Sequence, residues 1–141
     1  MLTLEQASGI ADAALATGRE LNLRPLAVTV LDPGGNPIVI AREDDAGILR
    51  HEIALAKAWG CLGMTRGGGD VAKHAERTPV GFAGISAISG GRLAPSRGGV
   101  LIRDDAGVIL GAVGVSGDNP DNDEKASLAG VASVGLVAEA G

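Results

Sequence analysis

Only two aromatic side chains, Trp59 and Phe82, occur among the 141 residues of this chain. The hydrophobic core therefore has to be built from Ala, Val, Leu and Ile. Glycine occurs 23 times, more than twice its usual share of ~7%. The 45% hydrophobic and 21% charged residues are ordinary for a globular protein and argue against a disordered chain. The length is that of one ordinary domain, so we expect residues 1–141 to form a single domain.

The charge and hydropathy patterns exclude two classes of partner. Twelve Lys and Arg against seventeen Asp and Glu give a net charge of −5, and the chain has no Tyr and one Phe. Clustered positive charge and stacking aromatic side chains, which nucleic-acid binding requires, are therefore missing. The longest nearly apolar stretch, residues 128–138, has eleven residues, well short of the ~20 of a membrane span. We expect neither a nucleic acid nor a membrane as a partner.

The first residues and the cysteine usage suggest a compartment. The N-terminal residues lack the basic and apolar regions of a signal peptide. The single cysteine, Cys61, has no partner for an internal disulfide, and an apolar segment surrounds it, so a buried, inert thiol is expected. These features predict a cytoplasmic protein.

Local signals predict helices and strands along the whole chain. Thr3 and Gln6 have the capping-box spacing, so a helix is expected to begin after Thr3 and to end near Asn22. Two β-hairpins are expected, in each case from β-branched runs that flank a turn sequence. Their predicted strands are residues 27–31, 38–42, 100–103 and 108–115.

Three further helical regions are predicted between and after the hairpins. Residues 48–64 are apolar nearly all round, which indicates burial on more than one side. Residues 70–89 should hold one or two short helices, with Pro79 starting the second. Asn119 and Pro120 suit the cap and the first position of a last helix. Strands joined as hairpins, with helices between them, predict an α+β domain with an antiparallel sheet.

Lys57 interrupts the apolar helix over residues 48–64 and is the first candidate for chemistry. A lysine in such surroundings has to reach solvent, pair with an acid or shift its pKa. Candidate partners are Asp32, Glu52 and Asp118. Lys57 could be a structural ion pair, a binder of carboxylates, or an acid–base group with Asp118 as its acid partner.

The glycine-rich segment 111–118 is the second candidate. Gly111 and Gly114 inside a strand suggest a bulge, or the close approach of another backbone or a ligand. Ser116, Gly117 and Asp118 then lead to a helix N-terminus, which suits a carboxylate or propionate group. The acids in the first turn of that helix oppose an added anion.

Metal and nucleotide signatures are missing. The chain has neither a P-loop motif nor a dinucleotide fingerprint. His51 and His74 are too few and too far apart for a zinc site, so no protein-only metal site is predicted. Haem needs only one axial donor and an apolar slot, so four side chains are candidate haem ligands. These are His51, His74, Met64 and Cys61.

Five segments, in the same order and at similar spacing, resemble the GlcG/HbpS family over nearly the whole chain. They are Asp32–Gly35 with Ala41–Asp44, Glu52–Ala54 with Lys57–Ala58, Gly98–Val100, Gly111–Asp118, and Asp121–Glu124. The resemblance implies a profilin-like α+β fold with a five-stranded antiparallel sheet, although the residue pattern alone predicts four strands. It also implies homo-oligomers and the binding of haem or iron.

The resemblance bears on the candidate residues as well. Neither His51 nor His74 falls on a position that matches a family ligand. Six positions do match the family's motif, and we expect them to line a ligand pocket. They are Lys57, Gly111, Gly114, Ser116, Gly117 and Asp118.

Three functional hypotheses follow. The first is a cytoplasmic, oligomeric protein that binds haem or a small anion. The second is an enzyme that acts on a small carbonyl or carboxylate metabolite, with Lys57 as base or electrostatic clamp and Asp118 as acid partner. The third is a ligand-free assembly protein in which the apolar helix over residues 48–64 serves as a subunit contact. All functional expectations depend on Lys57 and the glycine-rich segment facing one another across a cavity.

Overall fold

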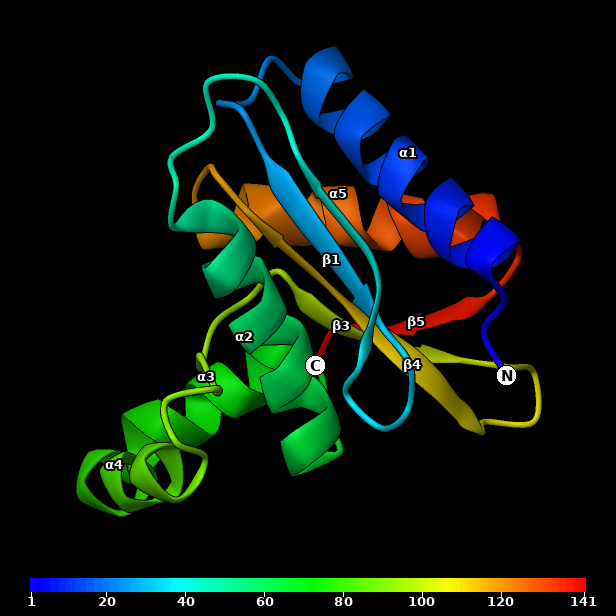
Figure 1. Ribbon diagram of the computed structural model, residues 1–141. Helices are drawn as coiled ribbons and strands as arrows, with labels where there is room; N and C mark the ends of the chain where they lie inside the picture. Colours follow the sequence, from blue (N-terminus) through cyan, green and yellow to red (C-terminus); the bar gives the residue numbers. More distant parts are fainter.

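A five-stranded antiparallel sheet separates two helical layers (Figure 1). The computed structural model describes residues 1–141. The strands are β1 Ala27–Leu31, β2 Pro37–Arg42, β3 Gly99–Arg103, β4 Ile109–Ser116 and β5 Val137–Glu139. The helices are α1 Leu4–Glu20, α2 Arg50–Met64, α3 Gly68–Arg77, α4 Pro79–Ile88 and α5 Pro120–Ser133.

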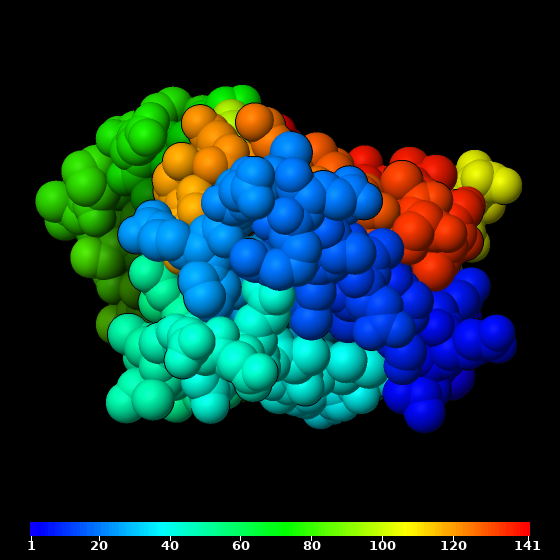
Figure 2. Space-filling view, turned by 90° about the horizontal axis from the view of Figure 1, so that it is seen from above, coloured from blue at the N-terminus to red at the C-terminus, as the bar shows by residue number.

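The strand order is β2-β1-β4-β3-β5, and every neighbouring pair is antiparallel. Helices α1 and α5 cover one face and build the larger core with the valines and isoleucine of the central strands. Helix α2 covers the other face, over a smaller cluster that includes Leu31, Leu101 and Ala112. Seen from above, α1 lies between α5 and the segment of β2 with its following loop, and the green α3–α4 segment lies at one side (Figure 2). The predicted α+β class is confirmed.

The local signals that begin the helices act as expected. Thr3 Oγ1 accepts from the Gln6 N–H and Gln6 Oε1 accepts from the Thr3 N–H, both at 3.0 Å, which is a complete capping box. Asn119 Oδ1 accepts from the Asn122 N–H at 2.9 Å, and Pro120 is the first residue of α5. Pro79 begins α4, so residues 70–89 do contain a second short helix. Local hydrogen bonds thus determine where these helices start.

The fifth strand, β5, is the element that the residue pattern did not predict. Helix α5 ends at Ser133, and Gly135 with φ +73° turns the chain into three strand residues. These pair with β3 at the edge of the sheet instead of closing a hairpin. A strand of three residues is too short to show an alternating hydrophobic pattern in the sequence. Its pairing with β3 therefore depends on tertiary packing.

Glycine in β4 allows helix α2 to lie directly against the sheet. A Cβ at Gly114 would collide with the backbone carbonyl of Ala54, and one at Gly111 would collide with the carbonyl of Leu31. The expectation of a close backbone approach is therefore correct at both positions. No helix combines the length and the apolar character needed to cross a bilayer.

Candidate functional site

Lys57 forms a buried ion pair on the sheet side of α2. Its Nζ donates to the Asp123 carboxylate and to the Val115 carbonyl, each at 3.0 Å. The side chains of Lys57 and Asp123 are only 5% and 1% exposed. Burial lowers the pKa of Lys57 below its usual value, and the nearby Asp123 charge counteracts part of that shift. The pair connects α2 on one face of the sheet with α5 on the other.

Asp123 is the partner that sequence reasoning missed. None of the three predicted partners, Asp32, Glu52 and Asp118, pairs with Lys57. Asp123 lies in the first turn of α5, a position where the helix dipole favours an acid whether or not it has a partner. Because Asn119 caps this helix and Pro120 starts it, that turn is held over the end of β4. The sequence signal that could have identified Asp123 as the partner of Lys57 is its place in the first turn of a helix that directly follows a buried strand.

Asp118 lies beside this pair and touches it only through its backbone, whose N–H donates to Asp123 Oδ1 at 2.9 Å. Its carboxylate accepts from the Asn122 side chain, from the Arg24 N–H and from the Asn119 N–H. These hydrogen bonds, that from Asn122 first, hold the pKa of Asp118 well below its usual value. Catalysis by Lys57 and Asp118 stays a prediction.

The glycine-rich segment faces protein backbone over most of its length. Gly111 and Gly114 adjoin the carbonyls of Leu31 and Ala54, as described above. Lys57 lines none of the five cavities of the molecule. The expected hollow between Lys57 and this segment is thus filled by the ion pair and by the packing of α2 on β4.

Gly117 is the member of the expected pocket set that does line a cavity. This cleft of about 220 Å³ is bounded by Arg24, Pro25, Asp45, Ala46, Gly47, Arg50 and Gly117. The guanidinium of Arg50 donates to the buried Ser116 hydroxyl at 3.2 Å. None of the seven ion pairs of the chain includes Arg50. The cleft therefore offers a cation without a carboxylate partner.

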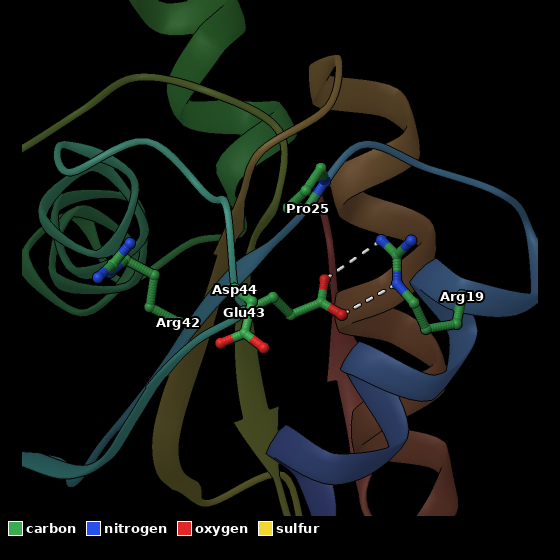
Figure 3. Close-up of a pocket in the computed structure, with 5 residues that line it drawn as sticks. All are labelled: Arg19, Pro25, Arg42, Glu43 and Asp44. Atoms are coloured by element: carbon green, nitrogen blue, oxygen red, sulfur yellow. Dashed lines mark hydrogen bonds and ion pairs between the residues drawn. The ribbon is translucent and has the colours of Figure 1, made fainter.

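The largest cavity, about 410 Å³, lies near the ends of α1 and β2 and has only polar or charged residues and a proline on its walls. Figure 3 shows the Arg19 guanidinium turned toward the Glu43 carboxylate, whereas Arg42 points to the opposite side. Glu43 pairs with Arg19 at 2.9 Å and accepts from the Leu26 N–H at 2.7 Å. These charges are used to hold the α1–β1 loop against the end of β2. The cavity offers no apolar wall to a ligand.

The most apolar cavity lies between α2 and α4 and is called here the Trp59 groove. Its volume is about 260 Å³, and its lining residues are Trp59, Gly63, Met64, Ile85, Ile88, Ser89, Arg92 and Leu93. The Arg92 guanidinium carbon lies 4.3 Å from the centre of the Trp59 ring, in cation–π contact. Trp59 also borders a smaller cavity of about 180 Å³ beside the β1–β2 turn. The groove therefore combines an apolar wall, a thioether and a cation.

The two histidines occupy different parts of the molecule. His74 on α3 stands edge-on to Phe82, with ring centres 5.4 Å apart, and its buried Nδ1 has no hydrogen-bond partner. Phe82 belongs to a cluster with Val71 and Leu93, against which Met64 of the Trp59 groove packs. His51 lies in the first turn of α2, away from this cluster. His74 is the histidine nearer to an apolar cavity.

Cys61 is the least suitable of the four candidate haem ligands. Its side chain is completely buried between α2 and the sheet. Burial raises the pKa of the Cys61 thiol to about 12. Because the thiolate is the form that binds metals, a thiol held protonated in this way is a poor ligand.

These features define an α+β protein with a five-stranded antiparallel sheet, helices on both faces and an apolar groove beside its one tryptophan. The chain belongs to the family described as "Haem degrading protein HbpS-like", whose model matches residues 2–132. The resemblance found in the sequence is thereby confirmed.

Two relatives from Citrobacter freundii illustrate the family. An uncharacterised 15.0 kDa protein of the dhaT–dhaS intergenic region is 30% identical over 122 residues, which are 86% of this chain and 84% of that protein. The corrinoid adenosyltransferase PduO is 23% identical over 135 residues, which are 96% of this chain. The match spans only 39% of the length of PduO.

Solved structures with the same fold include three with high TM-scores. The PduOC:heme complex gives a TM-score of 0.87 at 22% identity and covers 96% of each chain. Klebsiella pneumoniae protein ORFY gives 0.85 at 26% identity, covering 94% of this chain and 89% of that one. HbpS gives 0.82 at 29% identity, covering 95% and 90%.

Proposed function

We propose that this protein binds haem in the Trp59 groove and acts as a cytoplasmic homo-oligomer. The carrying observation is the groove itself, an apolar cavity with a thioether and a cation among its lining residues. Membership of the HbpS-like family, and the likeness to a solved haem complex, support haem as the ligand. The buried, protonated Cys61 agrees with a reducing compartment.

The residues of the groove match the chemistry of haem. The porphyrin faces are apolar and suit Trp59, Ile85 and Ile88, while a propionate carboxylate suits the Arg92 guanidinium. Because the groove is open at the surface, a flat ligand can insert one edge and leave the other in solvent. The haem iron, when bound, would supply redox chemistry that no side chain of this chain has.

Met64 and His74 are the proposed iron ligands. Met64 lines the groove, and thioether and imidazole are both axial donors in haem proteins. The Nδ1 atom of His74 has no partner in the structure, so its lone pair is not used by the fold. His74 does not line the groove and its buried Nδ1 adjoins the Phe82 ring, so coordination by His74 requires a local rearrangement.

Hemin titration tests this proposal. Trp59 is the only tryptophan, so quenching of its fluorescence reports binding at the groove, while the Soret band reports iron ligation. We expect quenching with a shifted Soret band in the wild type, weaker binding in Arg92→Ala, and an altered Soret band in Met64→Ala or His74→Ala.

His51→Ala is the matched control for the ligand variants, because His51 lies outside the groove. It should bind hemin as the wild type does. A wild-type spectrum indistinguishable from free hemin, together with unquenched Trp59, would reject haem binding. Quenching that survives in Arg92→Ala with unchanged affinity would reject the proposed orientation of the propionates.

A small carboxylate is the second candidate ligand, favoured by the unpaired Arg50 in the cleft beside Gly117. The guanidinium is already oriented by the Ser116 hydroxyl, and Arg24 is a second cation among the lining residues of the cleft. We expect small carboxylates to raise the melting temperature of the wild type and to have no such effect on Arg50→Met. A panel of carboxylates that shifts both proteins equally would exclude this cleft as the binding site.

A further inference from the structure

Trp59 separates two cavities of the molecule. One is the Trp59 groove, and the other, called here the turn cavity, has about 180 Å³ and lies where the β1–β2 turn adjoins the last turns of α2 (Figure 1). The two cavities share only Trp59 and Gly63 among their lining residues. Because Gly63 has no side chain, the indole of Trp59 is the only side chain that borders both cavities.

Small or exposed groups border the indole. A Cβ at Gly35 would lie 3.0 Å from Cδ1 and Nε1 of Trp59, so the pyrrole edge of the ring adjoins the β1–β2 turn. A Cβ at Gly63 would lie 3.4 Å from the six-membered ring. The exposed Arg92 covers the ring through its cation–π contact, and such contacts are weak at exposed sites. Neither glycine carries a side chain that would block a change of the Trp59 rotamer.

The β1–β2 turn forms the far wall of the turn cavity and is held in place by its own hydrogen bonds. Asp32 Oδ1 accepts from the N–H groups of Gly34 and Asn36, at 2.9 and 3.0 Å. Gly35 has a φ of +81°, a conformation that glycine adopts without steric cost. The turn therefore keeps its shape independently of the position of Trp59.

The volumes of the two cavities indicate that they serve one ligand together. Clefts that bury most of a drug-sized ligand have about 300–1,000 Å³. The Trp59 groove, with about 260 Å³, and the turn cavity, with about 180 Å³, each lie below this range. Joined, the two cavities would fall within it. The edge of a porphyrin therefore needs the space of both.

We propose that Trp59 is a movable partition and that the turn cavity is the inner half of the ligand site, which one porphyrin edge enters when the indole swings aside. This inference rests on the haem binding proposed above, and it adds the β1–β2 turn and Leu62 to the site. It also gives a role to the segment Asp32–Gly35, which the proposed function does not use.

The movement of the indole also releases Arg92. The Arg92 guanidinium covers the Trp59 ring, and its Nε donates to the Ser89 carbonyl at 2.7 Å. When the indole leaves, that hydrogen bond keeps the guanidinium at the groove, where its other N–H groups can bind a propionate carboxylate. The partition thus links the entry of the porphyrin edge to the release of the group that binds the propionate.

Leu62→Phe tests the role of the turn cavity, because Leu62 lines this cavity and not the Trp59 groove. The larger ring fills the turn cavity. Iron-free protoporphyrin IX is the probe, so that iron ligation has no part in the result. We expect Leu62→Phe to bind it at least tenfold more weakly than the wild type. Leu4→Phe, at a 65% exposed position of α1, is the matched control and should bind as the wild type does. Unchanged affinity in Leu62→Phe overturns the proposal.

Fluorotryptophan labelling reports the movement of the partition without any ligand. Trp59 is the only tryptophan, so the labelled protein has a single fluorine site. We expect its NMR resonance to show exchange on the μs–ms timescale in the wild type and none in Leu62→Phe, where the turn cavity is filled. A wild-type resonance without exchange, or exchange that persists unchanged in folded Leu62→Phe, overturns the partition.

The two measurements separate this inference from the haem proposal. If the wild type does not bind protoporphyrin IX, or if Leu62→Phe does not fold, the wild-type fluorine resonance decides alone. Exchange then supports the partition, and its absence refutes it. Failure of the hemin titration would reject haem binding and leave the fluorine result unaffected.

Discussion

Lys57 and Asp123 illustrate, at the scale of single residues, how a buried charge is made tolerable. Each charged group keeps more than one partner: Lys57 also donates to the Val115 carbonyl, and Asp123 also accepts from the Asp118 N–H. Burying two ions costs several kcal/mol each, which such hydrogen bonds and the mutual attraction offset. The pair therefore acts as a cross-link between the two layers. Removing one of its two members should destabilise the fold far more than replacing both with apolar residues.

We predict that Lys57→Met lowers the free energy of unfolding by about 3–5 kcal/mol, because it leaves the Asp123 carboxylate buried without its counter-ion. The double variant Lys57→Met with Asp123→Leu should recover a large part of that loss. Urea denaturation measures both values.

Lys73→Met is the control for this prediction. Lys73 pairs with Asp70 on exposed α3, with side chains 52% and 45% exposed. Removing such a surface pair should cost less than about 1 kcal/mol. If Lys57→Met were no more destabilising than Lys73→Met, the buried pair would not have the structural role assigned to it.

At the scale of elements, the packing of α2 on the sheet depends on small residues in both. Ala54, Ala58 and Cys61 are buried on the helix, and Gly114 provides the matching surface on β4. The chain has few large side chains to fill the space between layers, so it brings the backbones together instead. Dispersion contacts between closely packed backbone atoms replace part of the contribution that aromatic rings make elsewhere.

Gly114→Ala should therefore destabilise the protein by at least about 2 kcal/mol, because the new methyl group meets the Ala54 carbonyl and α2 has to shift. Gly63→Ala on α2 is the comparison, since its Cβ would make ordinary contact with the Trp59 ring at 3.4 Å. That change should be neutral or stabilising by up to about 1 kcal/mol. Thermal and urea denaturation should rank the two variants in this order, and the reverse order would contradict the packing described.

At the scale of the whole molecule, the two layers differ in how well their cores are filled. The layer of α1 and α5 contains the largest cluster of buried residues. Beyond α2, by contrast, helices α3 and α4 share a hydrophobic cluster of only three buried residues, Val71, Phe82 and Leu93. Both aromatic side chains of the chain, Trp59 and Phe82, are in or against this cluster. The thinly packed end of the molecule is thus where the groove opens and where Val80 and Ile88 stay exposed.

The arrangement of charges is a second whole-molecule feature. Lys57 on α2 and Asp123 on α5 are 66 residues apart and belong to opposite layers of the sheet. Their ion pair joins the layers at the end of β4, next to the capped start of α5. Arg97, which precedes β3, forms a second ion pair with α5, to Glu124 at 3.0 Å. The start of α5 is therefore held by charge as well as by packing.

The sequence alone determined the class of the fold and most element boundaries. The capping residues Thr3 and Asn119, the position of Pro79 and the turn sequences of the two hairpins act over a few residues, so their effect can be predicted from local chemistry. The order and spacing of five segments sufficed to indicate the family. The apolar context of Lys57 showed that this side chain needs solvent, an acid partner or a shifted pKa, and the strand context of Gly114 indicated a bulge or a close approach by another group.

Tertiary structure alone decided which residues meet. It selected Asp123 over Asp118 as the partner of Lys57, paired the short strand β5 with β3, and filled the expected pocket with the packing of α2 on β4. It also placed the apolar groove at Trp59, between two helices. The hydrophobic periodicity of each helix does not predict that the two helices lie side by side. The physical reason is that local signals act through hydrogen bonds to near neighbours, whereas a site is built from side chains whose separation depends on how distant elements pack.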